Sequence, residues 1–373
     1  MKGKTNLIVS LLTLLSFVLS VDSPAFAAAP SPLWEDLSPH EDFPVEWWYM
    51  TGFLKTEKGR RLGFQATFFR MENKKEKPAS QPSSRGPWAP SEIFGFHGAV
   101  SDLDKKTFVS TERDRRGFSR SVLAQSSPFS VRVGRNRLDH PTPASPSLSL
   151  SFRVENQSFS LRLSPQSPPV WHDKDKKFFT GPNPTDWAYY YSYPLVVVSG
   201  TRTVANPDGS LRTERVHGQC WFDHEWMVHT LNKNQIGWIW LWAWNKTNTQ
   251  GIMLYQMLDR GGGLSTFHRA TVMEKEGANW KITRSRDVFM TGGKTGRCLS
   301  LDRIAFEIGQ SQIVQIHPEI ERQLLGGTVS YWEGASKVDL GKIGAPDQGR
   351  GYLEVTGLDR WENGKLCRSS PRK

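Results

Sequence analysis

The sequence has few cysteines, and the three that it contains, Cys220, Cys298 and Cys367, are too far apart to form a zinc-binding or redox motif. Because their number is odd, at least one thiol stays unpaired or pairs with another molecule. A bond between Cys298 and Cys367 that fixes the C-terminal tail remains open, and geometry decides it. The nine histidines show no metal-ligand spacing either. We therefore expect no metal site.

Several catalytic motifs are also missing. The sequence contains no G-x-S-x-G motif, which argues against a standard α/β-hydrolase. It has no H-E-x-x-H, no P-loop and no G-x-G-x-x-G motif. Zinc and nucleotide cofactors thus have no support, and we expect the protein to work without a cofactor.

Long hydrophobic runs are absent except for one near the N-terminus. Lys2 and Lys4 precede the apolar run Leu7–Val21, and Ala25-Phe26-Ala27 has the small-x-small pattern of a signal-peptidase site. The run is shorter than the roughly 20 residues of a bilayer span. The pattern predicts a signal peptide over residues 1–27 that is cleaved near Ala27, and export across the inner membrane to the periplasm. An uncleaved N-terminal anchor is the alternative.

Positive charge exceeds negative charge, with a formal net charge of +11. The basic residues are scattered in small groups such as Arg113–Arg116 and Lys174–Lys177. This distribution favours a solvated cationic surface, with weak contact to an anionic membrane surface as the alternative. Export argues against a nucleic-acid partner.

Apolar and polar residues alternate through most of the chain, which is typical of β-strands. Leu148–Val154 and Phe159–Leu163 flank Glu155-Asn156-Gln157 and predict a hairpin. The other predicted strands are Glu46–Leu54, Leu62–Arg70, Ile93–Ser101, Leu195–Thr203, Val216–Trp226, Trp238–Trp244, Ile252–Leu258, Trp280–Thr283 and Tyr352–Leu358. Only Pro318–Leu325 is a short helix candidate. We therefore expect an all-β fold of barrels or sandwiches.

The length of the chain suggests two domains. Pro207-Asp208-Gly209 predicts a turn before a new strand, so we place the boundary near Asn206–Gly218. The expected organisation is a linker over residues 28–40, an N-terminal domain over 41–212, a C-terminal domain over 213–367 and a tail over 368–373. Each half opens with a strand that carries a glutamate beside tryptophan, which is weak evidence for two copies of one fold.

Tryptophan is concentrated in one region. Six of the 15 tryptophans lie within 24 residues, in the segments Trp221–Trp226 and Trp238–Trp244. On the second strand, four indoles share one face. Such bulky side chains overfill an ordinary core but suit the wall of a ligand cavity. The alternative is that the rings fill a wide barrel and that Asp223 and Glu225 are structural carboxylates.

Carboxyl groups beside indole rings have a specific chemical use. Burial raises the pKa of a carboxyl group, so that it stays protonated and can act as a general acid. Aromatic faces stabilise a developing carbocation. On a strand, Asp223 and Glu225 share one face with Trp221, while His224 lies on the other. His224 is therefore either a proton relay or a core histidine.

The first half contains a similar strand, Glu46-Trp47-Trp48-Tyr49. Arg70 is the expected buried partner of Glu46 in a structural ion pair. Trp48, Tyr49 and His97 are further candidates for lining a ligand cavity.

Several segments together resemble the AttH/carotenoid 1,2-hydratase family, including its branch of secreted proteins. The matching segments are Pro44–Gly52, Gly63–Arg70, Gly218–Trp226, Gly237-Trp238, Tyr331–Ala335 and Gly349–Gly357. They follow the order of the family. The resemblance implies two lipocalin-like, calycin-type antiparallel β-barrels packed together.

By the same resemblance, the protein adds water to an isoprenoid-like double bond without a cofactor. Asp223 or Glu225 would donate the proton, and Trp238, Trp240 and Tyr255 would line the cavity. Trp221 and Trp242 complete the expected ligand-binding set. Two functions stay open: a hydratase, or a related lyase or hydrolase, that acts on a hydrophobic molecule, and a periplasmic carrier of a lipid or other hydrophobic ligand associated with an export system. A structural or assembly partner with a basic surface is a third.

Overall fold

The computed structural model describes residues 34–72, 92–117, 121–142, 144–260, 263–309, 312–327, 330–342 and 345–369. The expected signal peptide, residues 1–27, lies outside this part of the chain. Within it, the one helical element is a single 3-10 turn, Leu301–Arg303, and all other regular structure is antiparallel β-sheet. None of the described residues forms a helix of the length and apolar character needed to cross a membrane. The expected all-β fold is confirmed.

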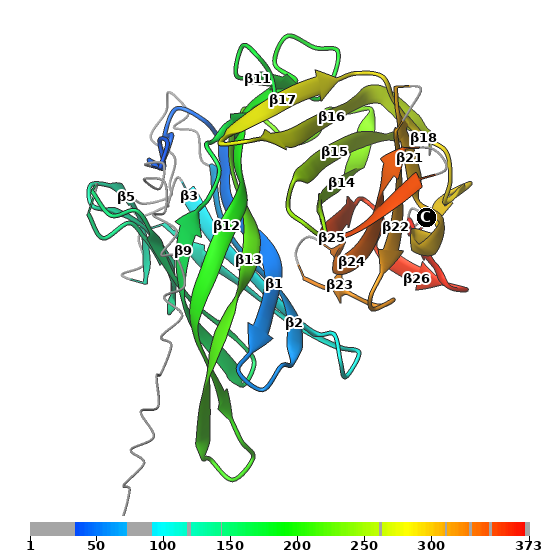
Figure 1. Ribbon diagram of the computed structural model, residues 1–373. Coiled ribbons are helices and arrows are strands. Elements are labelled where there is room, and N and C mark those ends of the chain that lie inside the picture. Colours follow the sequence, from blue (N-terminus) through cyan, green and yellow to red (C-terminus); the bar gives the residue numbers. More distant parts are fainter. Residues whose placement is uncertain are drawn as a thin grey trace, which may run out of the picture. The chain divides into compact units, whose positions relative to one another are not determined.

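The first sheet has 13 strands in the order β4-β3-β2-β1-β13-β12-β9-β8-β7-β6-β5, with β10 and β11 paired to β12 (Figure 1). Its strands are β1 (Val45–Thr56), β2 (Arg61–Glu72), β3 (Glu92–Asp102), β4 (Thr107–Arg116), β5 (Val122–Ser126), β6 (Phe129–Val133), β7 (Asn136–Asp139), β8 (Leu148–Val154), β9 (Gln157–Pro165), β10 (Val170–Trp171), β11 (Lys177–Phe179), β12 (Trp187–Ala205) and β13 (Leu211–Met227).

The second sheet has ten strands in the order β17-β16-β15-β14-β25-β24-β22-β21-β18, with β23 paired to β24. Its strands are β14 (Gln235–Asn245), β15 (Gln250–Asp259), β16 (Leu264–Glu276), β17 (Asn279–Ser285), β18 (Val288–Met290), β21 (Ala305–Ile308), β22 (Gln312–Pro318), β23 (Leu324–Leu325), β24 (Tyr331–Lys342) and β25 (Ala345–Thr356). The two sheets are nearly closed barrels, as in lipocalins.

A small third sheet pairs β19 (Lys294–Thr295), β20 (Cys298–Leu299), β27 (Lys365–Cys367) and β26 (Arg360–Glu362) in that order. The disulfide Cys298–Cys367 joins two of its strands and closes a segment with a sequence separation of 69. Cys220 is a buried free thiol. The structure thus contains the bond that the sequence left open.

Strand pairing differs from the expected domain boundary. The segment Asn206–Gly218 contains the turn between β12 and β13 and the first part of β13, which pairs with β12. The second half of β13 also pairs with β1. The segment Asp223–Trp226 therefore belongs to the first barrel, and the second begins at Gln235. The turn at Pro207-Asp208-Gly209 is real, but it closes a hairpin within one sheet. Pro318–Leu325 is also not a helix, because Pro318 ends β22 and Leu324–Leu325 pair with β24.

In the expected hairpin of β8 and β9, the alternation of apolar and polar residues corresponds to the inner and outer faces of the first barrel. In β8, Leu148, Leu150, Phe152 and Val154 are buried in the first barrel, and the residues between them are more exposed. Val154 pairs with Gln157, so the turn has two residues, and Glu155 takes a φ of 48° there. Such a positive φ is what a tight hairpin turn requires.

Strands β1 and β13 are buried on both faces. Trp48 and Met50 point into the core of the first barrel, whereas Tyr49 and Phe53 belong to a second cluster with Trp240 of β14 and other side chains of both sheets. Because apolar groups cover each face, these strands lack the simple polar alternation of a solvated barrel wall. The second cluster positions the candidate site.

Candidate functional site

A cavity of about 620 Å³ is lined by both barrels, a size common for small-molecule sites. The first sheet contributes side chains from β1, β2, β3, β4, β12 and β13, and the second from β14, β15, β24 and β25. Seven of the residues singled out from the sequence line it: Tyr49, His97, Asp223, Glu225, Trp238, Trp240 and Tyr255.

Strand register explains why distant residues of the first sheet meet in this wall. Asp223 lies opposite Tyr49, Tyr49 opposite Thr67, and Thr67 opposite His97. Residues directly opposite in antiparallel strands project to the same face of the sheet. Glu225 is two residues from Asp223 on β13, so it faces the cavity in the adjacent row.

Asp223 is buried and accepts three side-chain hydrogen bonds. Trp221 Nε1 donates to Oδ1 at 2.6 Å, Ser192 Oγ donates to the same oxygen, and Tyr190 Oη donates to Oδ2 at 3.2 Å. Burial raises the pKa of Asp223 to about 8, although these donors oppose the rise. The group therefore changes its charge close to neutral pH.

Glu225 is half-buried at the cavity wall. Burial, followed by the neighbouring carboxyl groups of Asp223 and Glu354, raises its pKa well above the ordinary value, and a hydrogen bond with Trp47 opposes this. These influences thus favour the protonated form of the carboxyl group. A protonated carboxyl group that faces an aromatic cavity can donate its proton to a bound molecule.

Two carboxyl groups that were not predicted come from the second barrel. Glu354 on β25 lines the cavity and accepts a hydrogen bond from Trp238 Nε1 at 2.8 Å, and burial raises its pKa to about 7. Glu333 on β24 is paired with Glu354 in the sheet and accepts a hydrogen bond from Tyr49 Oη at 2.9 Å. Each of these glutamates follows aromatic residues on its strand, as Glu225 does on β13. This sequence pattern could have identified both as candidate site residues.

The four carboxyl groups of Asp223, Glu225, Glu333 and Glu354 share one electrostatic property. Within the described part of the chain, no cationic side chain forms an ion pair with any of them or is among the main influences on their pKa values. Burial is the largest influence on the pKa of each, and it raises all four. Burial therefore favours the protonated form of carboxyl groups in and next to the aromatic cavity wall.

Four predicted site residues lie outside the cavity wall. Trp48 is part of the first barrel core, because its neighbours in register place it on the opposite face from Tyr49. Trp221 and Trp242 stack on each other with ring centroids 5.8 Å apart and form a layer behind the wall. His224 is completely buried on the far face of β13. Both faces of these strands are buried, so alternation alone could not tell which face meets the cavity.

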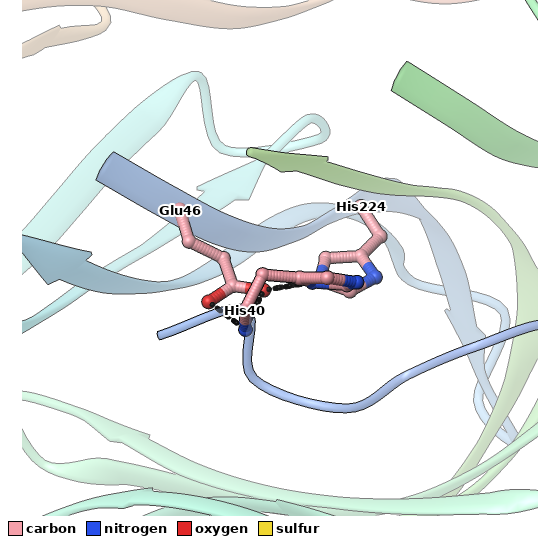
Figure 2. Close-up of side chains that lie close together, drawn as sticks. All are labelled: His40, Glu46 and His224. Carbon is pink, nitrogen blue, oxygen red and sulfur yellow. Dashed lines mark hydrogen bonds and ion pairs between the residues drawn. The ribbon is translucent and has the colours of Figure 1, made fainter. Parts of the chain in front are cut away.

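His224 instead belongs to a cluster with Glu46 and His40 inside the first barrel (Figure 2). Glu46 Oε1 accepts hydrogen bonds from His40 Nδ1 at 2.8 Å and His224 Nε2 at 2.9 Å. Arg70 Nε donates to Glu46 Oε2 at 2.9 Å, so the expected contact between Glu46 and Arg70 is present. The histidines and Arg70 outweigh the effect of burial and lower the pKa of Glu46 to about 2.

This cluster has the ligand types of a metal site, but its charge favours a structural role. Arg70 places a fixed positive charge next to Glu46, and Arg70 Nη2 also donates to the backbone carbonyl of Phe43 at 2.7 Å. His40 stacks on Trp226 with ring centroids 3.7 Å apart. The cluster therefore fastens the segment before β1 to the first barrel.

Comparisons with known proteins agree with this architecture. The AttH-like family model matches residues 27–358. The crystal structure of an AttH protein from Nitrosomonas europaea is 25% identical, with a TM-score of 0.70 over 91% of this chain and 100% of that chain. Kievitone hydratase from Nectria haematococca is 13% identical, with a TM-score of 0.62 over 87% of this chain and 93% of that chain. No curated protein gave a significant match.

Proposed function

Because this chain belongs to the AttH-like family, we propose that it is a cofactor-independent hydratase, or a related lyase or hydrolase, that acts on a hydrophobic small molecule. The observation that carries this proposal is the position of Glu225, a carboxyl group with a raised pKa that lines an aromatic cavity together with Asp223 and Glu354. The name of the similar kievitone hydratase supports the same reaction class. The expected substrate is isoprenoid or lipid-like, with an electron-rich double bond.

The proposed reaction uses only groups of the cavity. The π electrons of the substrate double bond form a new C–H bond with the proton of Glu225, which leaves a carbocation on the substrate and a carboxylate on Glu225. The indole faces of Trp238 and Trp240 stabilise this cation. Water then forms a C–O bond with the cation and returns one proton to Glu225. The reverse sequence eliminates water.

Asp223 and Glu354 keep Glu225 in the reactive form. A negative charge on either neighbour disfavours a second negative charge on Glu225, as in other sites where two carboxyl groups share one proton. Asp223 is itself held by Trp221, Ser192 and Tyr190. We assign to Glu225 the role of proton donor. Burial is the main cause of its raised pKa, and Asp223 adds to this as the pH approaches its own pKa of about 8 and it becomes charged.

One observation favours a carrier instead. Asp223 accepts three hydrogen bonds from fixed donors, as a structural carboxylate does. In that case the cavity would hold a lipid or other hydrophobic ligand in the periplasm without changing it. In both proposals, a signal peptide over residues 1–27 directs export of the protein.

The two functions are separated by a conversion assay. Native mass spectrometry of the purified protein first identifies a co-purifying ligand, and this molecule is then incubated with the protein in water enriched in the heavy oxygen isotope. A hydratase incorporates the label into product. Glu225→Gln should abolish incorporation but keep ligand binding, measured by tryptophan fluorescence. The matched control Glu276→Gln, at an exposed carboxyl group, should keep both. Equal binding by all forms and no labelled product would leave only the carrier.

A further inference from the structure

A second set of polar side chains lines the same cavity, three strands away from Asp223. His97 on β3, Glu112 on β4 and Tyr331 on β24 all reach the cavity wall. His97 and Tyr331 are 6% and 5% exposed, respectively. With neighbouring strands about 4.8 Å apart, His97 lies roughly 14 Å from Asp223 along the first sheet. The set around His97 therefore starts from other strands of the wall than the proton transfer proposed for Glu225.

The three side chains form a directed chain of hydrogen bonds. Gln65 Nε2 donates to Tyr331 Oη at 2.7 Å, so the hydroxyl proton of Tyr331 is free to point at His97 Nδ1, which is 3.0 Å away. His97 Nδ1 is then the acceptor, and the ring proton resides on Nε2. His97 Nε2 lies 3.2 Å from Glu112 Oε1 and donates to it.

This order is that of a hydroxyl, an imidazole and a carboxylate in a proton relay. Burial lowers the pKa of His97, which keeps the imidazole neutral and able to accept a proton, while Glu112 opposes this and would stabilise the imidazolium once formed. Burial and the nearby Glu333 raise the pKa of Tyr331, so its hydroxyl is protonated at rest. Tyr331 therefore becomes a base only when His97 takes its proton.

The backbone at Gly327 lies close to the carboxylate of Glu112. A Cβ atom at Gly327 would overlap the Glu112 carboxylate, so a larger residue there would displace the carboxylate from this position. His97 is fixed on its other sides by the ring of Phe69, with centroids 4.7 Å apart, and by the ring of Tyr331. The relay is thus held by packing from both barrels.

We propose that Tyr331, His97 and Glu112 form a second acid–base centre, which removes a proton from a weakly acidic C–H or O–H group of the bound molecule. This inference rests on the proposed function, because it places a second reactive group of the same ligand in the same cavity. The C–H or O–H bond breaks, its proton goes to Tyr331 Oη, and the Tyr331 proton goes to His97 Nδ1. The electron pair stays on the ligand. Tyr331 is the catalytic residue, and His97 and Glu112 are positioning residues.

The substrate class follows from the two ends of the cavity. A ligand that uses both centres is elongated and hydrophobic, with an alkene at Glu225 and a phenol or a carbon acid at Tyr331. A purely hydrocarbon ligand offers no such proton.

A chromogenic carbon acid, nitrobenzisoxazole, tests this centre without knowledge of the natural ligand. Removal of its ring C–H proton breaks the N–O bond, forms a nitrile and releases a coloured phenolate, and neither water nor Glu225 is required. Tyr331→Phe and His97→Gln should each lower kcat/KM about 100-fold, in the range for general base catalysis. Tyr352→Phe, a buried tyrosine outside the cavity wall, and His317→Gln, on the surface, are the matched controls and should keep the rate.

A spectroscopic measurement separates a catalytic from a merely structural role. In protein with nitrogen-labelled histidine, His97 should be neutral at pH 7 with its proton on Nε2, and Glu112→Gln or Gly327→Ala should shift the tautomer toward Nδ1. A doubly protonated His97, or a proton on Nδ1 in the wild type, would overturn the proposal. The proposal would also be overturned if Tyr331→Phe kept the elimination rate of wild type while Glu225→Gln or the addition of a chelator lowered it. If the protein failed to hydrate its ligand, the proposed function would be refuted. The elimination rates and the tautomer of His97 would still test the second acid–base centre.

Discussion

Tyr49 of the first barrel donates a hydrogen bond to Glu333 of the second barrel, with 2.9 Å between Oη and Oε1. Both side chains are buried, and Tyr49 also lies in the row that leads from Asp223 to His97. This contact joins the carboxyl groups of the second sheet to the cavity wall of the first.

Removal of that hydroxyl should destabilise the protein. Tyr49→Phe removes the hydrogen bond that Tyr49 donates to the buried Glu333, and a lost partner of a buried polar group costs about 1–3 kcal/mol. Urea unfolding measures the change in free energy. Tyr189→Phe is the control, because its ring packs against Phe43 and Trp226 and should keep the stability close to wild type. Equal stabilities of the two variants would contradict the importance of the contact.

The raised pKa of Asp223 predicts how stability depends on pH. In the native state the group keeps its proton up to a pKa of about 8, whereas in the unfolded chain it loses it near pH 4. Its contribution is therefore complete below about pH 4 and is lost as the pH rises toward 8. Asp223→Asn cannot ionise, so its stability relative to wild type should rise between about pH 5 and pH 8.

Thermal unfolding of Asp223→Asn and wild type over this pH range gives the comparison. Asp347→Asn, at a residue that bonds Asn245 outside the cavity, is the control and should show no such trend. A difference that stays constant with pH would show that Asp223 is ionised throughout.

The cluster around Glu46 predicts a larger loss of stability. Glu46→Gln keeps the size of the side chain but removes one of the two carboxylate partners of the buried Arg70, and Glu92 remains as the other. Breaking a buried pair costs about 3–5 kcal/mol, and the remaining partner should keep the loss near the lower end of that range. The low pKa of Glu46 implies that its contribution is present above about pH 4 and is lost as the pH falls toward 2. Urea unfolding at neutral pH provides the value.

Asp104→Asn is the comparison for Glu46→Gln, because it breaks the exposed pair with Arg61, which solvent screens, and should cost much less stability. If the two variants lost the same stability, the Glu46 cluster would not fasten the segment before β1.

The disulfide Cys298–Cys367 should stabilise the end of the second barrel. A cross-link that closes a sequence separation of 69 contributes about 4 kcal/mol in the chain-entropy description. The double variant Cys298→Ser/Cys367→Ser should unfold at a correspondingly lower urea concentration. Reductant should lower the stability of wild type to that of the variant and leave the variant unchanged. If reductant also destabilised the variant, the stability change would not come from the Cys298–Cys367 bond.

The fold could be predicted from the sequence because alternation, hairpin turns and the missing helical periods all point to antiparallel sheet. The hairpin at Glu155 and the strand Trp238–Trp244 are correct for this reason. The boundary was misplaced because the turn at Pro207-Asp208-Gly209 looks the same whether it separates two barrels or two strands of one barrel.

The site could be predicted only in part. Asp223, Glu225, Trp238 and Trp240 line the cavity and were singled out because they are close in sequence. Glu354 lines it from β25, and Glu333 lies behind it, opposite Glu354 and bonded to Tyr49. Trp48, Trp221, Trp242 and His224 were misplaced because their strands are buried on both faces. Periodicity fixes which residues share a face, but not what that face contacts.

The protonation state of Glu225 tests the central claim most directly, because it requires no substrate. Infrared difference spectra of wild type against Glu225→Gln at neutral pH report whether this side chain is a carboxylic acid or a carboxylate. We expect the variant to lose a band of a protonated carboxyl group. Loss of carboxylate bands instead would show that Glu225 is ionised in the resting protein and cannot be the proton donor.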